Sequence, residues 1–118
     1  MKAYKRVDFL QLPHKTIYSR LSEEYFKGLY CKTTGPNDGW VNDWIEVNLI
    51  SEFRGPAHIK DGGDIVQYFE DNCIHKQESF ETDLTVGGRD GCFDDSDIFI
   101  VWDKDDISRL INYLIPLI

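Results

Sequence analysis

Four short stretches of the chain predict β-strands, either because they are rich in β-branched and aromatic residues or because apolar and polar residues alternate. The four stretches are residues 15–20, 25–32, 44–50 and 80–86. In the third stretch, Ile45, Val47 and Leu49 share one face, while Glu46 and Asn48 share the opposite face. We therefore expect one face of that strand to contact solvent.

Two of these predicted strands have a further feature. Gly28 lies inside the second stretch, where a glycine indicates a bulge or a close approach to the backbone. In the fourth stretch the alternation places Phe80, Leu84 and Val86 on the inward face. The short connections after the first three strands favour an antiparallel meander.

A fifth stretch, residues 98–102 (IFIVW), is apolar without alternation. A strand of this kind is typical of the interior of a sheet, where both faces are covered. We expect it to be the central strand.

Apolar residues also recur at helical spacing in two longer segments. The first follows Asp61 and Asp64, either of which is a suitable N-cap. The second follows Asp103, another favourable N-cap, and Asp105 and Asp106 place negative charge where the helix dipole favours it. The apolar positions expected to be buried are Ile65, Val66, Phe69 and Cys73 in the first helix (residues 61–73) and Ile107, Leu110, Ile111 and Leu114 in the second.

A shorter helical turn is expected near the amino terminus. Asp8 is able to cap this turn, its apolar residues are Phe9, Leu10 and Leu12, and Pro13 ends it. The whole pattern predicts the α+β class, with a mostly antiparallel five-stranded sheet, two main helices and the short N-terminal helical turn.

Length and composition agree with one globular domain. The chain has 118 residues, of which 42% are hydrophobic, which is enough to bury a core without disulfides or a structural metal. We therefore expect a single domain over residues 1–118. The three cysteines show no CxxC spacing, and the amino terminus has no apolar signal-peptide core, so we expect free thiols in the cytoplasm of a bacterium or a phage-infected host.

Negative charge is concentrated in one half of the chain. Residues 61–106 contain 14 acidic and 3 basic side chains, a balance of −11, whereas the whole chain carries −8. This asymmetry argues against nucleic acid or an anionic membrane as a partner of the acidic half. It favours a basic protein partner, a cation, or a role in solubility alone.

The loop of residues 87–97 is the most acidic turn, and its carboxylates could supply oxygen ligands to a divalent cation. Read as an EF-hand loop from Asp90, it has Asp95 where glycine is required and Val101 where glutamate is required. The simpler interpretation is a solvated turn whose aspartates cap neighbouring backbone groups. We predict no metal and no cofactor.

No catalytic signature is present: the chain has no GxSxG, no Walker loop and no HExxH. We therefore assign no catalytic residues and expect a protein that is not an enzyme. Exposed tryptophan and arginine side chains often anchor protein interfaces, although two tryptophans that flank a polar loop also fit simple packing on the sheet. The predicted partner-binding residues are Arg89, Asp90, Asp94, Asp95, Asp97, Trp40 and Trp44.

Both ends of the chain resemble known sequences. Residues 9–13 (FLQLP) with 16–19 (TIYS), and residues 88–95 (GRDGCFDD) with the apolar strand and helix start that follow, are similar to a group of small, uncharacterised, acidic bacterial and prophage-encoded proteins. The resemblance covers about half of the chain. It implies a phage or mobile-element origin and no particular activity.

These observations favour a non-enzymatic, acidic, protein-binding module. The hypothesis is an inhibitor or antidote, either a phage anti-defence protein of the anti-CRISPR or anti-restriction type or an immunity protein for a nuclease toxin, that covers a basic nucleic-acid-binding surface. The alternatives are a small-ligand or divalent-metal module that uses residues 87–97, an enzyme of unrecognised type, and an interaction domain whose acidity serves solubility.

Overall fold

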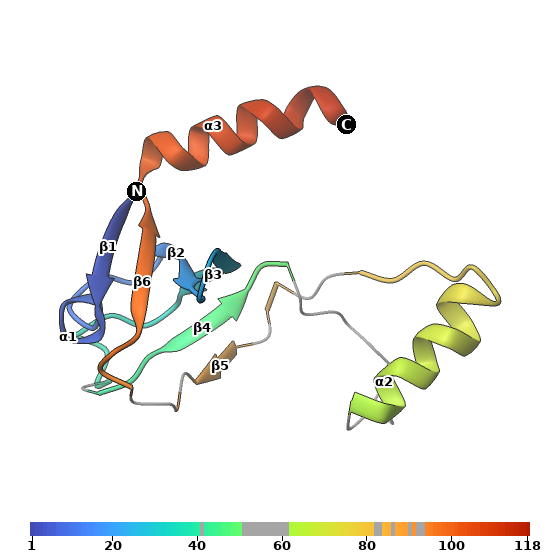
Figure 1. The fold of residues 1–118 in the computed structure, drawn as a ribbon, viewed down its shortest axis with the longest axis horizontal. Helices are drawn as coiled ribbons and strands as arrows, with labels where there is room; N and C mark the ends of the chain where they lie inside the picture. The colour runs from blue at the N-terminus through green and yellow to red at the C-terminus, as the bar shows by residue number, and fades with distance from the viewer. Residues whose placement is uncertain (41, 51–61, 82–83, 86, 90, 92–93) are drawn as a thin grey trace.

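The computed structural model describes the chain except for residues 41, 51–61, 82–83, 86, 90 and 92–93 (Figure 1). Within the described residues, six strands form one antiparallel sheet in the order β1-β6-β2-β3-β4-β5. The strands are β1 (Lys2–Lys5), β2 (Ile17–Leu21), β3 (Phe26–Lys32), β4 (Ile45–Asn48), β5 (Gly87–Arg89) and β6 (Ile98–Trp102).

In the described part of the chain, three α-helices accompany the sheet, and two of them continue into a different helical form. They are α1 (Arg6–Phe9), α2 (Gly62–Tyr68) with the π-helix η1 (Phe69–Ile74), and α3 (Lys104–Leu114) with the 3-10 turn η2 (Ile115–Leu117). The predicted α+β class is therefore confirmed, as is the antiparallel meander β2-β3-β4.

Two strands differ from the prediction. The alternating stretch 80–86 is not a strand in its described residues, and Phe80 and Leu84 are exposed instead of inward, so this expectation is wrong. The sheet instead uses β5, where Gly87 and Gly88 pair with β4. Pairing of this kind depends on main-chain hydrogen bonds, which side-chain alternation does not report.

Strand β6 lies inside the sheet, between β1 and β2, as its unbroken apolar sequence predicts. Its successive residues Phe99 and Ile100 are both buried, and they point to opposite faces of the sheet. The pairing with β1 was not predicted, because residues 2–5 contain two lysines and no apolar alternation strong enough to indicate a strand.

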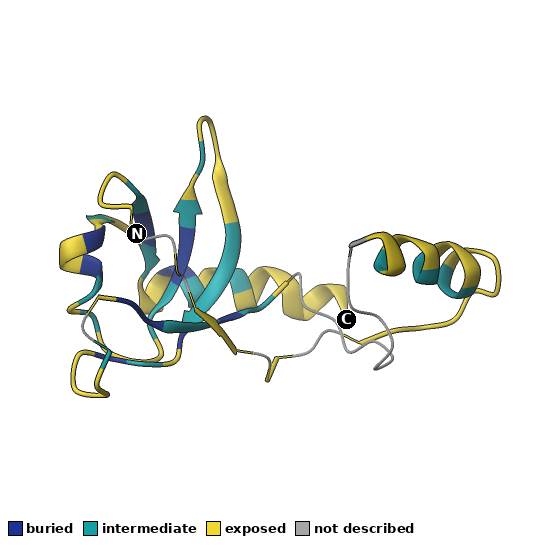
Figure 2. Cartoon of the chain, turned by 90° about the horizontal axis from the view of Figure 1, so that it is seen from below, coloured by how far each residue is buried: buried dark blue, intermediate teal, exposed yellow. Residues whose placement is uncertain are grey.

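One face of the sheet carries an aromatic core. Phe9 from α1 stacks on Phe99 with ring centres 4.3 Å apart, and it meets Trp44 edge-on at 4.9 Å. Tyr18 completes this group, and all four side chains are fully buried. Figure 2 shows these buried positions gathered at one end of the molecule, around the strands and α1.

Helix α1 is held by tertiary contacts instead of a side-chain cap. Asp8 lies within α1, and the N-cap position is Lys5, which makes no capping bond, so the predicted cap is wrong. At the other end, the Lys32 Nζ atom donates to the carbonyl oxygens of Phe9, Leu10 and Leu12, at 3.1, 3.1 and 2.7 Å. Burial lowers the pKa of Lys32 to about 8, because the charged form is poorly solvated there.

Gly28 sits at a bulge, as predicted. The register between β2 and β3 shifts between Tyr18 and Arg20, and Gly28 has a φ of +72°. A Cβ atom at this position would lie 2.5 Å from the ring of Tyr30, which leaves no room for a larger residue. The Ser19 hydroxyl also donates to the Gly28 carbonyl at 2.6 Å.

The expectation that Glu46 faces solvent is wrong. Glu46 shares the face of the sheet that carries Trp44, and its side chain is only 14% exposed. Its carboxylate accepts from the Arg20 guanidinium, with both oxygens 3.0 Å from Nη2, and from Trp44 Nε1 at 3.1 Å. These partners explain why a carboxylate is tolerated beside an aromatic core.

The predicted helix at residues 61–73 corresponds to α2 and η1 in its described part, while Asp61 lies outside the described residues. Ile65, Phe69 and Cys73 are half-buried and Val66 is exposed, so this stripe does not form a core. The Phe69 ring instead contacts Phe80 edge-on, with centres 4.9 Å apart.

Helix α3 begins as predicted but is not buried as predicted. Asp103 is the N-cap and forms a capping box with Asp106. Of the expected buried stripe, however, Ile111 and Leu114 are exposed. The physical reason is visible in Figure 1, where α3 leaves the end of β6 and runs away from the strands, so that the sheet does not cover it.

Candidate protein-binding surface

The acidic loop that precedes β6 is fixed at its start by Asp43. This buried residue lies immediately before Trp44 and accepts three hydrogen bonds: from the Trp44 N–H at 2.8 Å, from Arg89 Nε at 2.9 Å and from the Gly91 N–H at 3.4 Å. Burial opposes ionisation, but the hydrogen bonds from Trp44, Arg89 and Gly91 outweigh it, so the pKa of Asp43 is lowered. Ionised Asp43 therefore ties the end of β5 to the start of β4.

Two predicted contact residues meet at this point. The Arg89 guanidinium carbon lies 5.2 Å from the ring centre of Trp40, which is a cation–π distance. The Arg89 side chain is 60% exposed, and Trp40 is half-buried. Together with Asp43 they form a compact group whose outer part faces solvent.

The middle of the loop is a turn closed by Asp94. Its carboxylate accepts from the Ser96 N–H at 2.9 Å and from the Ser96 hydroxyl at 2.7 Å, while the Asp97 N–H donates to the Asp94 carbonyl at 3.2 Å. The bonds from Ser96 lower the pKa of Asp94, and the nearby positive charges of Arg6 and Lys5 act in the same direction. Lys5 Nζ also donates to the Ser96 carbonyl, at 3.3 Å.

The remaining aspartates of the loop differ from one another in exposure. Asp95 is exposed, whereas Asp97 is half-buried and lines a pocket of about 160 Å³ together with Arg20 and Lys27. Asp90 lies outside the described residues. The carboxylates presented to solvent by the described part of the loop are therefore those of Asp94 and Asp95.

Trp44 is not part of this surface. It is fully buried, and its Nε1 atom donates to the Tyr18 hydroxyl at 2.9 Å as well as to Glu46. The structure thus agrees with the alternative interpretation for Trp44, packing against the sheet, and leaves Trp40 as the tryptophan near the loop.

Sequence reasoning missed the ion pair between Arg20 and Glu46. The Arg20 guanidinium lies within 6.0 Å of the ring centres of Tyr18 and Trp44. A signal was present, because Arg20 follows Tyr18 by two residues and Glu46 follows Trp44 by two, which puts each charge on the aromatic face of its strand. Asp43 was also missed, and nothing in its local sequence distinguishes it from an exposed loop residue.

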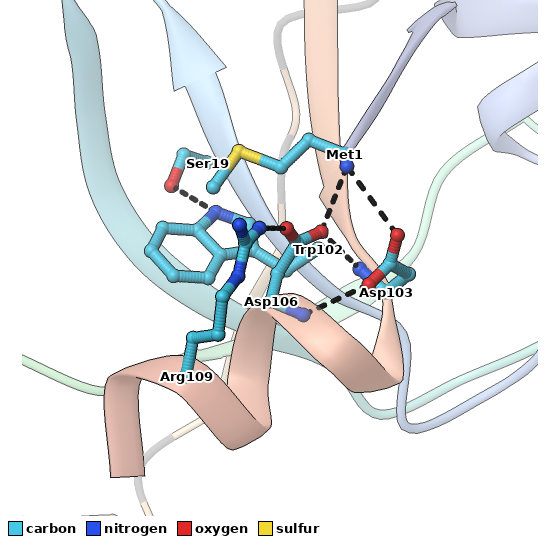
Figure 3. Close-up of polar contacts among 6 residues, drawn as sticks. All are labelled: Met1, Ser19, Trp102, Asp103, Asp106 and Arg109. Atoms are coloured by element: carbon cyan, nitrogen blue, oxygen red, sulfur yellow. Dashed lines mark hydrogen bonds and ion pairs between the residues drawn. The ribbon is translucent and has the colours of Figure 1, made fainter. Parts of the chain in front are cut away.

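Two aspartates at the start of α3, Asp103 and Asp106, are occupied by contacts within the chain (Figure 3). The buried Asp106 carboxylate accepts from the Asp103 N–H at 2.9 Å, lies 2.8 Å from the amino group of Met1 and accepts from Arg109. The hydrogen bond with the Met1 amino group is the main reason that the pKa of Asp106 is lowered, and the Asp103 N–H and Arg109 add to it. Asp106 therefore stabilises the fold and is not available to a partner.

Among the residues that the structure describes, no three His, Cys, Asp or Glu residues gather closely enough to hold a metal ion. The described helices include none with the length and apolar character to cross a membrane. Cys31 and Cys73 are free thiols, and burial raises the pKa of Cys31.

No protein family model, no curated protein and no solved structure matches this chain. The resemblance of its two ends to small prophage-encoded proteins thus stays a prediction.

Proposed function

We propose that this chain is a non-enzymatic, acidic, protein-binding module that covers a basic nucleic-acid-binding surface of its partner. The observation that carries the proposal is the exposed carboxylate pair Asp94 and Asp95 on a turn that is held in place on both sides. Asp43 holds the start of the loop through Arg89 and Gly91, and Ser96 closes the turn. A surface that is already ordered loses less conformational entropy when it binds.

The charge of the chain supports the same proposal. Carboxylates at fixed positions resemble the phosphates of a nucleic acid, and a net charge of −8 steers the chain toward a basic surface. The contact would weaken as salt rises, because screening reduces attraction between exposed charges. The class of protein that we propose is therefore a nuclease inhibitor, either a phage anti-defence protein or a toxin-immunity protein, whose carboxylates occupy the basic surface that binds nucleic acid.

Arg89, five positions before Asp94 in the chain, and the Trp40 ring that it contacts give the proposed surface an anchor. Tryptophan and arginine are among the residue types that contribute most to binding at the centre of protein interfaces, and both of these side chains are partly accessible. We therefore include both residues in the proposed contact together with Asp94 and Asp95, and we leave out the buried Trp44.

The test uses a panel of purified bacterial restriction endonucleases, CRISPR effectors and nuclease toxins. Binding of the chain and inhibition of DNA cleavage are measured at 50 and 300 mM NaCl, which spans about a factor of two in screening length. We expect one panel member to bind, with an affinity that falls at the higher salt. The triple variant Asp94→Asn, Asp95→Asn, Asp97→Asn is expected to bind at least about tenfold more weakly.

A matched control separates a specific surface from general acidity. Glu23→Gln, Glu24→Gln and Glu78→Gln remove the same number of charges from exposed positions outside the loop. Asparagine at position 94 keeps an oxygen that can accept from Ser96, so the turn is retained. Equal losses in the two triple variants, or no binding to any panel member at 50 mM NaCl, would contradict the proposal.

A further inference from the structure

Helix α3 carries an apolar face that the described structure leaves uncovered. Ile111 and Leu114 are 48% and 47% exposed, and the exposure continues into η2, where Leu117 reaches 69%. Residues 107, 110, 111 and 114 have the spacing of one helical stripe. Figure 2 shows α3 exposed over most of its length, in contrast to the strands at its start.

The start of this helix is firmly fixed, so its apolar face is presented in a defined direction. Asp103 and Asp106 form the capping box, and Asp106 also pairs with the Met1 amino group and with Arg109 (Figure 3). Trp102, which precedes the cap, donates from Nε1 to the Ser19 hydroxyl at 3.0 Å. The Asp106–Met1 pair joins the start of α3 to the residue before β1, and the Trp102–Ser19 hydrogen bond joins the end of β6 to the middle of β2.

The apolar face also differs in charge from the other exposed apolar positions. Residues 110–118 (LINYLIPLI) contain no charged side chain, although 29% of the chain is charged. Several other exposed apolar residues stand beside carboxylates: Tyr25 and Phe26 follow Glu23 and Glu24, Val66 and Ile74 share α2–η1 with Asp64, Glu70 and Asp71, and Phe80 lies between Glu78 and Glu81.

This charge pattern decides among the possible occupants of the face. A basic partner would gain no electrostatic attraction from residues 110–118, and an anionic lipid surface requires lysine and arginine on the helix. The basic residues of α3 are Lys104 and Arg109, and Arg109 is paired with Asp106. A second copy of this chain, also at −8, would be repelled at the acidic apolar sites but not at the uncharged end of α3.

We propose that the α3 face is the interface of a homodimer, in which the stripe of one copy packs against the same stripe of a second copy. A two-fold arrangement of this kind uses one patch twice. The helix is short, at about 16 Å for its 11 residues, so the contact is smaller than a standard interface. We therefore expect a weak dimer with a dissociation constant of about 10–100 µM.

The test is sedimentation velocity of the full chain over a range of concentrations. We expect a rise toward twice the 13.8 kDa mass of one chain, and a shift to the monomer in the double variant Ile111→Gln, Leu114→Gln. Both side chains are about half exposed in the single copy, and glutamine is a good helix former, so circular dichroism should show unchanged helix content.

The matched control is Val66→Gln, Ile74→Gln, which makes the same chemical change at two exposed helical positions outside α3. It should dimerise like the unmodified chain. A chain that stays monomeric at about ten times the expected dissociation constant would overturn the proposal. So would a dimer that survives Ile111→Gln, Leu114→Gln, a control variant that dissociates equally, or binding of the monomer to phosphatidylglycerol vesicles in place of dimerisation.

This inference does not depend on the proposed nuclease partner. Dimerisation through an uncharged face should be at least as strong at 300 mM NaCl as at 50 mM, because salt screens the repulsion between two copies at −8, whereas binding through Asp94 and Asp95 should weaken. The glutamine variant in α3 should keep its affinity for the basic partner, and the asparagine variant in the loop should keep its dimer.

Discussion

Helices α1 and α3 contrast in how they meet the rest of the molecule. The first has 4 residues and no side-chain cap, yet its Phe9 is fully buried in the aromatic core. The second has 11 residues, a complete capping box and a regular apolar stripe, yet that stripe is largely exposed. A complete set of local helix signals therefore does not decide whether another element covers the helix.

The source of stability differs accordingly. Helix α1 depends on distant groups: Lys32 on β3 satisfies the carbonyls at and after its C-terminal end, and Arg6 Nη2 donates to the Asn42 carbonyl at 2.6 Å. Helix α3 depends mainly on contacts close to its first turn, apart from the Met1 amino group. The following experiments examine this contrast.

The largest effect is expected at Phe9. Truncation by Phe9→Ala removes a ring that contacts Tyr18, Trp44 and Phe99, and it should lower the free energy of unfolding by about 3–5 kcal/mol. Leu114→Ala, an equally apolar truncation on α3, should change it by less than about 0.5 kcal/mol in dilute solution. Urea denaturation measures both, with Phe9→Leu as a milder core variant. If Phe9→Ala and Leu114→Ala lower the free energy of unfolding by similar amounts, α1 and α3 do not differ in how much they depend on burial.

Lys32→Met should have the next largest effect. The substitution keeps the length of the side chain but leaves the carbonyls of Phe9, Leu10 and Leu12 without this donor, which should cost about 2–4 kcal/mol. Lys27→Met, an exposed change on the same strand, is the control and should be nearly neutral. If the two variants unfold at the same urea concentration, Lys32 does not hold α1.

Glu46→Gln should destabilise the chain by about 1–2 kcal/mol, because it removes the charge that faces Arg20 beside the aromatic core. Glutamine has nearly the same shape and retains one acceptor, so the core itself should stay packed. The control is Glu23→Gln at an exposed position of the hairpin between β2 and β3. Thermal unfolding measures the difference, and equal midpoints for the two variants would show that the pair contributes nothing.

The smallest effect is expected in the pH dependence of the first turn of α3. The pKa of Asp106 is lower in the folded state than in the unfolded state, so its stabilising contribution is present above about pH 4 and is lost as pH falls toward the folded pKa. Asp43 acts in the same direction. Asp106→Asn should therefore lose less stability than the unmodified chain between pH 6 and about pH 3.

Urea denaturation at several pH values in that range measures this loss. Asp105→Asn is the control, since Asp105 is an exposed neighbour in the same turn. The assignment to Asp106 fails if its variant loses as much stability on acidification as the unmodified chain does.

Much of the fold could be predicted because the signals are local. The strands β2, β3, β4 and β6 follow apolar patterns, the bulge at Gly28 follows from one glycine, and the start of α3 follows from Asp103. Strand β5 could not be predicted. Its glycines have no side chain that would mark an apolar or a polar face, and its pairing with β4 depends on main-chain hydrogen bonds.

The candidate surface was predicted only in part, for a related reason. Asp94 and Asp95 are exposed on a turn, as their sequence indicates, but the contact that fixes the loop joins Asp43 to Arg89, 46 positions away. No periodicity links residues so far apart. Trp44 and Trp40 are only four residues apart and similar in local sequence, yet one is in the core and the other lies beside Arg89.

By itself, the sequence determined four of the six described strands (β2, β3, β4 and β6), where α3 begins, and that negative charge is concentrated between residues 61 and 106. Only the tertiary structure decided which face of each element is covered. It turned Glu46 toward Arg20, buried Trp44 and left the stripe of α3 open. The physical reason is that backbone hydrogen bonding and capping act over a few residues, whereas burial depends on which distant side chains arrive at the same place.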